Sequence, residues 1–429
     1  MPCRALLHHY PIGLIHIMKR GFYTIIAAQF FSSLADNALL IAAIALLTEL
    51  HAPDWMTPML KEFFYISYVL LAPFVGAFAD AMPKGRVMFI TNLIKISGCF
   101  LMFQGVHPLA AYAMVGLGAA AYSPAKYGIL TELLPPEQLV VANGWIEGST
   151  VGSIILGVVF GGALVAPRIS HLLLQLDFPM IETGVDTPAE AAICVIAAIY
   201  LIAALINLRI PLTNAVYQKQ SHTLPTLLQD FGRCFNILWR DPQGQISLAI
   251  TTLFWGAGAT LQFIVLEWAR QKFHMPLSEA TRLQGAVAIG VAAGAIMAAR
   301  IVPLHKSFTV LSTGVLMGLI VIIMTKVTSV PLAYGLLIAI GALSGFFVVP
   351  MNAMLQHRGH VLMSAGHSIA VQNFNENLSI LAMLGMYALM VKMSLSINVV
   401  IVLFGSFISL TMALVIRRHL NNLRRAPHA

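Results

Sequence analysis

Five ionisable side chains stand inside long apolar stretches of this sequence. Asp36, Glu147 and Glu376 are acids, and Lys95 and Lys126 are bases. A charge placed among lipid chains costs about 2.5 kcal/mol or more, so such groups are expected to face a protein interior or a water-filled passage. We interpret them as groups that bind a charged solute or couple its movement to an ion. A purely structural salt bridge is the alternative for Asp36.

Uncharged polar residues accompany the acids at helical spacing, so that each acid belongs to a polar stripe on one helix face. The residues that share a stripe are Gln29, Ser32, Ser33 and Asp36, with Asn37 at the border; then Asn143, Glu147 and Thr150; then Gln372, Asn373 and Glu376. Each stripe is expected to face the interior cavity. Acids from these stripes are expected to pair with Lys95 or Lys126.

A short loop between two apolar stretches has the spacing Gly76-x3-Asp80-x3-Lys84-Gly85-Arg86. Glycine lets two helices approach closely. Asp80 is placed to cap the N-terminus of the helix near residue 368 and to pair with nearby cations. A contact of this kind exists in one conformation and breaks in another, so we predict a conformational gate. Lys95 either supports this gate or pairs with an acid.

The composition requires lipid as the solvent for most of the surface. Of 429 residues, 59% are apolar and 10% are charged, against about 25% charged in soluble domains. The net charge of +8 is carried by scattered Lys and Arg without a basic stripe, which argues against nucleic-acid binding. The sequence shows no catalytic constellation, metal-ligand spacing or nucleotide loop, so we predict a non-enzyme with no cofactor.

Twelve apolar stretches approach the ~20 residues that a helix needs to cross hydrocarbon. They span 22–47, 62–78, 87–103, 109–127, 139–165, 188–210, 245–266, 280–299, 308–324, 330–349, 368–391 and 397–416. Sixteen of the 25 Lys and Arg residues fall on one side of this arrangement and six on the other, which predicts that both termini are cytoplasmic.

The expected domains are an N-terminal cytoplasmic segment (1–21), a six-helix bundle (22–211), a linker (212–244), a second six-helix bundle (245–416) and a basic tail (417–429). Leu224, Phe231 and Leu238 belong to a helical apolar pattern in the linker, which predicts an amphipathic helix on the inner leaflet. Met18, just before the first stretch, is a possible alternative start to Met1.

The two halves repeat each other weakly at an offset of about 224–230 residues. Pro124, which we place at the end of the fourth stretch, corresponds to Pro350 at the end of the tenth. Asn143 corresponds to Asn373. These pairs predict an all-α membrane protein of 12 transmembrane helices in two pseudo-symmetric bundles.

Seven sequence runs together resemble the bacterial lysophospholipid transporter family, a branch of the major facilitator superfamily. They are FFSSLADNALL (30–40), FVGAFADAMPKGRV (74–87), GAAAYSPAKYGIL (118–130), ANGWIEGST (142–150), FWGAG (254–258), GFFVVPMN (345–352) and AVQNFNEN (370–377). The resemblance extends over about residues 22–416.

The resemblance implies a monomeric flippase of the inner membrane. It is expected to carry lysophosphatidylethanolamine and lysophosphatidylglycerol-type lipids from the outer to the inner leaflet. There, an acyltransferase with acyl-carrier-protein synthetase activity is expected to re-acylate them. Gln262 stands where some relatives carry an arginine, so it joins the candidate residues that bind the head group.

Two other readings stay open from the residues. The first is a proton-coupled drug or metabolite exporter of the same fold. The second, a membrane acyltransferase, needs a His and Asp at reactive spacing, which the sequence does not show.

Overall fold

The computed structural model describes residues 20–53, 56–175, 185–213, 215, 223–275 and 277–425. Most of the predicted N-terminal segment, the alternative start at Met18, part of the linker and the last four residues lie outside the described residues. Within the described ranges, all regular secondary structure is helical.

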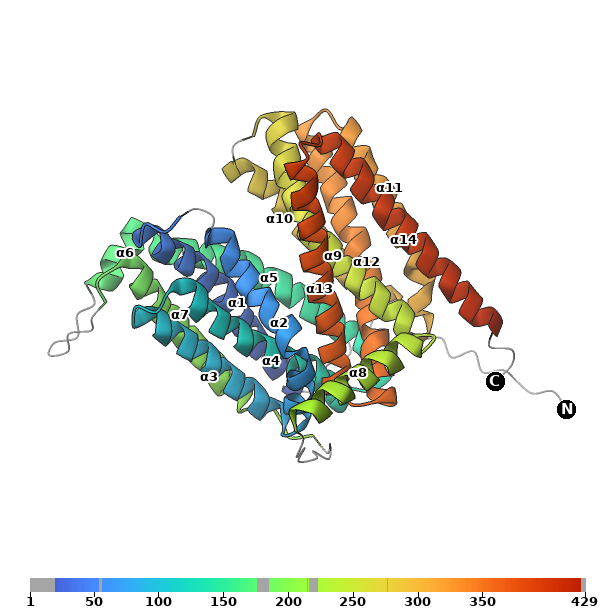
Figure 1. Cartoon of the computed structure of the whole chain (residues 1–429), viewed down its shortest axis with the longest axis horizontal. Helices are drawn as coiled ribbons and strands as arrows, with labels where there is room; N and C mark the ends of the chain where they lie inside the picture. The colour runs from blue at the N-terminus through green and yellow to red at the C-terminus, as the bar shows by residue number, and fades with distance from the viewer. Residues whose placement is uncertain are drawn as a thin grey trace.

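Two groups of long helices make up the molecule. The first contains α1 (Arg20–Glu49), α2 (Met56–Asp80), α3 (Lys84–Phe103), α4 (Pro108–Leu133), α5 (Leu139–Val165) and α7 (Pro188–Asn207), with the short α6 (Pro167–Leu174). The second contains α9 (Gly244–Phe273), α10 (Leu277–Ile301), α11 (Leu311–Ile323), α12 (Val330–Leu362), α13 (Ala365–Lys392) and α14 (Ile397–Arg425). Helix α8 (Leu224–Arg240) connects them. The groups meet at the end where α8 lies, here called the closed end, and diverge toward the opposite, open end (Figure 1).

Eleven helical segments in the described ranges are long and apolar enough to cross a membrane. They coincide with eleven of the twelve predicted stretches. The remaining stretch is α4, which is 26 residues long, carries Ser123, Lys126 and Glu132, and is not among these eleven segments. Most of its residues are buried, since it packs against α2 and α3 within its own group and against α13 of the other.

The expected positions of the two prolines are wrong. Pro124 and Pro350 lie inside α4 and α12, which continue to Leu133 and Leu362. A proline removes one backbone donor, but helices in membrane proteins tolerate this where neighbouring groups satisfy the freed carbonyl. The apolar pattern of α12 stops before the helix does, because polar residues such as Gln356 lie in its last turns.

Glycines set the closest helix contact in the second group. A Cβ on Gly290 or Gly294 of α10 would overlap the carbonyl oxygens of Ile338 or Ala342 on α12. A Cβ on Gly341 of α12 would in turn overlap the Val287 carbonyl on α10. Small residues at four-residue spacing on both helices allow this close packing.

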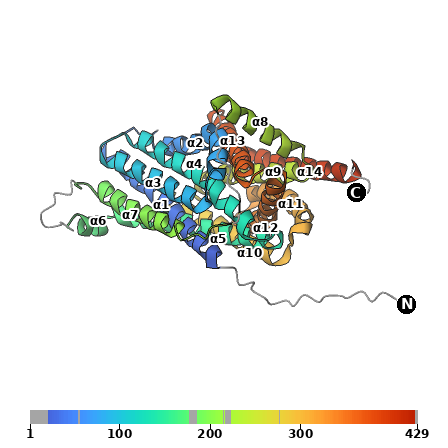
Figure 2. The ribbon, with the colours of Figure 1, turned by 90° about the horizontal axis from the view of Figure 1, so that it is seen from below.

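The predicted amphipathic linker helix is present as α8, and Figure 2 shows it lying across the end of α13. Part of its apolar face packs on protein. The rings of Phe231 and Phe235 lie with centroids 5.5 and 6.2 Å from that of Phe374 on α13. Leu224 and Leu228 near its start are exposed.

A salt bridge fixes the junction between α8 and α9. The Arg358 guanidinium of α12 donates to both carboxylate oxygens of Asp241, at 2.5 and 3.1 Å, and the Gly244 backbone N–H donates at 2.7 Å. Burial raises the pKa of Asp241, but these hydrogen bonds outweigh it and hold the pKa below its usual value. The carboxylate thereby ties the start of α9 to the end of α12.

Candidate functional site

A cavity of about 350 Å³ lies between the two helix groups. Most of its wall comes from α1, α2, α3, α4 and α5, and Trp255 and Gln262 of α9 contribute from the other group. Six of the residues singled out from the sequence line it: Gln29, Ser33, Asp36, Asn37, Lys126 and Gln262. Lys95, assigned to the gate, lines it as well. The remaining candidates, Glu147, Gln372, Asn373 and Glu376, are buried and are not among its lining residues.

Asp36 is held in a dense polar network on the cavity wall. The Lys95 ammonium lies 2.8 Å from each of its carboxylate oxygens, and the Tyr200 hydroxyl donates to Oδ1 at 2.6 Å. Lys95 also donates to Ser32 Oγ at 3.0 Å, and Ser32 donates to Asn92 at 2.8 Å. Of the two readings for Lys95, the structure therefore has the pairing with an acid. The lysine is 1% exposed, whereas the Asp36 side chain is 19% exposed on the cavity side.

The polar face of α1 also bonds to α5. Gln29 donates to Thr150 Oγ1 at 2.9 Å and accepts from Ser149 at 3.0 Å, while Ser153 donates to Ser33 Oγ at 2.8 Å. These bonds join two stripes that the sequence analysis placed on separate helices. The amides and hydroxyls thus have partners within the wall.

Lys126 contrasts with Lys95. Its Nζ lies 4.2 Å from the centroid of the Tyr127 ring, and within the described part of the chain it makes no hydrogen bond or ion pair. An ammonium over an aromatic face is weakly stabilised. It retains donors for an anion that arrives in the cavity.

Much of the remaining cavity wall is aromatic or aliphatic. The Phe64 ring lies 5.9 Å from that of Tyr68 and 5.6 Å from that of Tyr112. Ile154 and Val158 of α5 line the cavity and are about 40% exposed. A molecule with both a charged and an apolar part matches this combination.

Polar side chains from both groups meet in a closing seam at the closed end. We define the seam by the residues that contact one another across the two groups and by two residues bonded directly beside them. The cross-group contacts are made by Asp80, Ser123, Asn143 and Glu147 from the first group, and Asn352, Gln356, Ser364, Gly366, His367 and Asn373 from or beside α12 and α13. Gln372, which donates to Asn352, and Glu376, which accepts from Gln372, complete the seam within the second group.

Buried amides form the middle of the seam. Asn143 and Gln356 each donate to the other at 2.9 Å. Asn352 donates to Glu147 Oε1 at 3.3 Å and accepts from Gln372 at 2.9 Å. Gln372 also donates to Glu376 Oε1 at 2.7 Å, and Ser123 donates to Asn373 Oδ1 at 3.3 Å. Of the four candidates that do not line the cavity, Glu147 and Asn373 thus bond across the two groups, and Gln372 and Glu376 lie beside these bonds within the second group.

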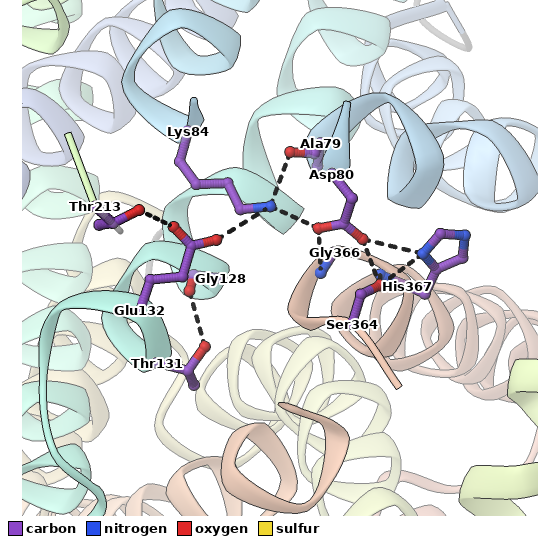
Figure 3. Close-up of polar contacts among 10 residues, drawn as sticks. All are labelled: Ala79, Asp80, Lys84, Gly128, Thr131, Glu132, Thr213, Ser364, Gly366 and His367. Carbon is purple, nitrogen blue, oxygen red and sulfur yellow. Dashed lines mark hydrogen bonds and ion pairs between the residues drawn. The ribbon is translucent and has the colours of Figure 1, made fainter. Parts of the chain in front are cut away.

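Asp80 makes the part of the seam at the start of α13, as Figure 3 shows. Its Oδ1 accepts from the Gly366 backbone N–H at 3.1 Å, and its Oδ2 accepts from Ser364 Oγ at 2.5 Å and lies 3.0 Å from His367 Nδ1. Ser364 is the N-cap of α13, so Asp80 caps the helix that the sequence analysis expected. Lys84 Nζ lies 2.6 Å away on the same side.

The remaining gate residues differ in their surroundings. A Cβ on Gly76 would lie 3.0 Å from His367 Cα, so a larger residue here would push α2 and α13 slightly apart. Lys84 lies 3.5 Å from Glu132, whose carboxylate accepts from Thr213 at 2.7 Å (Figure 3). Arg86 is exposed and lies outside these contacts, beside a separate pocket of about 290 Å³.

Sequence reasoning missed several partners. Ser364, three residues before His367 and just ahead of an apolar stretch, carries an N-cap signal that was available. Tyr200 and Asn352 stand in apolar runs without a local pattern, and Lys61 was placed in an outer loop, although it lines the cavity.

Comparisons with known proteins agree with this architecture. The family model described as Major Facilitator Superfamily matches residues 25–383. The lysophospholipid transporters LplT of Yersinia pestis and Yersinia pseudotuberculosis are 43% identical over 378 residues, which is 88% of this chain and 88% of each relative.

Solved structures share the fold at low identity. A bacterial homologue of the iron transporter ferroportin in an outward-facing state has a TM-score of 0.68 at 13% identity, covering 95% of this chain and 99% of its own. The transporter FucP in the outward conformation has a TM-score of 0.70 at 14% identity, covering 94% of this chain and 98% of its own.

Proposed function

Because this chain belongs to the major facilitator superfamily and, within it, to the lysophospholipid transporter family, we propose that it carries lysophospholipids from the outer to the inner leaflet of the bacterial inner membrane. The substrates are lysophosphatidylethanolamine and lysophosphatidylglycerol-type lipids. The observation that carries the proposal is the cavity between the groups, which combines the unpartnered ammonium of Lys126 with an aromatic and aliphatic wall.

The chemistry of the substrate matches the two parts of this wall. A lysophospholipid has one acyl chain and a head group with a phosphate. Lys126 is free to make charge-assisted hydrogen bonds to the phosphate, which are stronger than neutral ones. Tyr68, Ile154 and Val158 offer apolar surface to the part of the acyl chain nearest the head group.

In this proposal α4 also crosses the membrane, which brings the number of transmembrane helices to twelve. It is deeply packed, so its polar residues face protein and cavity rather than lipid. The excess of Lys and Arg places both termini in the cytoplasm. The closing seam then lies on the cytoplasmic side, and the cavity communicates with the outer side.

Transport occurs when the closed end of the molecule opens and the open end closes. The seam breaks, the outer ends of the groups approach one another, and the head group is released toward the cytoplasmic leaflet. The polar contacts of the seam exist in only one of the two states, so they set part of the equilibrium between them. A cytoplasmic acyltransferase re-acylates the delivered lipid, and the transporter acts as a monomer.

Uptake of labelled lysophosphatidylethanolamine into spheroplasts tests the proposal. Cells that carry the protein should accumulate the lipid in the inner leaflet faster than a strain that lacks it. Lys126→Ala should lower uptake about tenfold, the value of one charge-assisted hydrogen bond, with normal membrane insertion.

The matched control is Lys392→Ala, which removes an exposed lysine at the end of α13. It should leave uptake unchanged. Equal uptake with and without the protein, combined with altered tolerance to drugs, would instead support an exporter of the same fold.

A further inference from the structure

The charges that line the cavity do not balance. Three lysines, Lys61, Lys95 and Lys126, and a single carboxylate, Asp36, are among its lining residues. Asp36 is already engaged, because Lys95 and Tyr200 both contact its carboxylate within 2.8 Å. The Asp36–Lys95 pair is neutral as a unit. Two positive charges therefore remain to face whatever occupies the cavity.

Lys61 is the second of these cations. It lies in the early turns of α2, nineteen residues before Asp80, which places it about 28 Å from the closed end along the helix. In the part of the chain that the structure describes, its ammonium has no hydrogen bond and no ion pair. It is thus a cation near the open end of the cavity wall.

Lys126 lies deeper. Helix α4 runs in the same direction as α2, since Gly128 of α4 faces Ala365 and Gly76 of α2 faces His367, both at the start of α13. Lys126 is two residues from Gly128, so it lies near the closed end. The two unpartnered ammonium groups are therefore placed at different depths of one cavity.

The other acids close to the cavity do not line it, although Glu147 and Glu376 act on Lys126 electrostatically from the seam. Glu147 and Glu376 are buried in the seam, where amide groups of Asn352 and Gln372 donate to them. Glu62 follows Lys61 in the sequence but is not among the residues that line the cavity. An ammonium on a bound head group would find two like charges and no carboxylate that lacks a partner.

We propose that Lys61 is a head-group-selecting residue, and that with Lys126 it makes this carrier prefer lysophospholipids with a net negative head group over zwitterionic ones. The inference rests on the proposed function and ranks its substrates. Lysophosphatidylglycerol carries a phosphate and an uncharged glycerol, so Lys61 attracts it near the open end and Lys126 attracts it deeper in the cavity. Lysophosphatidylethanolamine adds an ammonium that the second lysine repels.

The test uses the purified full-length protein in liposomes. Two lysophospholipids with the same radiolabelled acyl chain, one with a glycerol and one with an ethanolamine head group, are added outside at equal concentrations well below saturation. Albumin then extracts the lipid that remains in the outer leaflet. Protein-dependent movement of the glycerol lipid should exceed that of the ethanolamine lipid by about tenfold, the effect of one charge-assisted contact.

Three variants identify the contribution of Lys61. Lys61→Gln should lower movement of the glycerol lipid about tenfold and change the ethanolamine lipid less than about twofold, which removes most of the preference. Lys61→Arg keeps the charge and should keep the preference. Lys272→Gln, which removes an exposed lysine near the end of α9, should behave as the wild type.

The outcomes separate the two proposals. If the wild type moves both lipids equally, or if Lys61→Gln lowers both to the same extent, the inference is overturned and the proposed function stands. If the wild type moves neither lipid, the proposed function is overturned and the inference with it.

Discussion

Replacing Asp80 with asparagine should loosen the closing seam. Three groups on the α13 side contact the carboxylate: Ser364 Oγ, the Gly366 N–H and His367 Nδ1, at 2.5 to 3.1 Å. Asn keeps one acceptor oxygen but loses the negative charge. Charge assistance is worth about 1 kcal/mol for each hydrogen bond, so the loss is about 2–4 kcal/mol across the three.

This loss falls on one conformation. The contacts to α13 join the two helix groups, so they disappear when the seam opens. At 1.4 kcal/mol for each factor of ten, Asp80→Asn should raise the ratio of seam-open to seam-closed molecules by about 30- to 700-fold. Lys84 lies on the same side as Asp80, so the contact between them does not depend on the seam.

A thiol at Val75 measures this ratio. Val75 is 6% exposed and packs in a small apolar cluster with Ala121 and with Ala370 of α13. Val75→Cys adds no volume, and its labelling by a water-soluble maleimide requires the seam to open. The reaction is followed in detergent, after replacement of the native cysteines Cys3, Cys99, Cys194 and Cys234.

Asp80→Asn should raise the labelling rate of this thiol by at least about 30-fold. The matched control is Asp230→Asn, which removes another acid near the same end. Asp230 lies on α8, 3.6 Å from the exposed Arg233, and makes no ion pair with α13 among the described residues. Unchanged labelling in Asp80→Asn, or an equal rise in both variants, would refute the assignment of Asp80 as a gate residue.

Three further predictions concern stability, measured as the melting temperature of the detergent-solubilised protein. Gly294→Ala should destabilise by about 1–3 kcal/mol, because its Cβ overlaps a carbonyl of α12, whereas Gly335→Ala meets open space and should be neutral; similar losses in both would contradict the close packing. Lys95→Gln should cost about 3–5 kcal/mol because it leaves the Asp36 charge unpaired. The double variant with Asp36→Asn should cost less than the sum of the two single variants; costs that simply add would contradict the pairing. Asp241→Asn should lower the melting temperature at pH 7. Since the folded state lowers the pKa of Asp241, its contribution is fully present above the unfolded pKa of about 3.9 and is lost as the pH falls through the lower folded pKa, so a gap between wild type and variant that does not narrow below about pH 3.9 would count against the assignment.

The sequence was sufficient to predict most helices and one long-range contact. Apolar length alone locates a membrane-crossing helix, because no other open-ended structure satisfies its backbone in lipid. The contact between Asp80 and the start of α13 was also predictable. A short loop fixes where the acid lies relative to two helices, and a helix N-terminus is a general site for a carboxylate.

Pairings inside the bundle could not be predicted from sequence. Lys95 was expected near the gate or beside an acid, and only the lateral arrangement of α1, α3 and α7 brings it to Asp36 and Tyr200. A tyrosine in an apolar run has the same local pattern whether it donates to a carboxylate or packs in the core. The Asn143–Gln356 pair joins residues 213 positions apart, with no local signal for their meeting.

The two sides of the closing seam differ in chemistry. On one side, α2 meets α13 through the Asp80 carboxylate and its charge-assisted bonds. On the other, α5 meets α10 through small apolar groups: a Cβ on Gly144 would lie 2.7 Å from Ala299 Cβ. In the second half, Ala298 follows Gly294 at the spacing by which Asp80 follows Gly76, and it is buried. Separating α2 from α13 breaks the hydrogen bonds to the Asp80 carboxylate. Separating α5 from α10 exposes small apolar surfaces, and separating α5 from α12 breaks the hydrogen bonds of Asn143 and Glu147. Three contacts across the seam converge on the single Asp80 carboxylate, which is why one substitution there should shift the equilibrium.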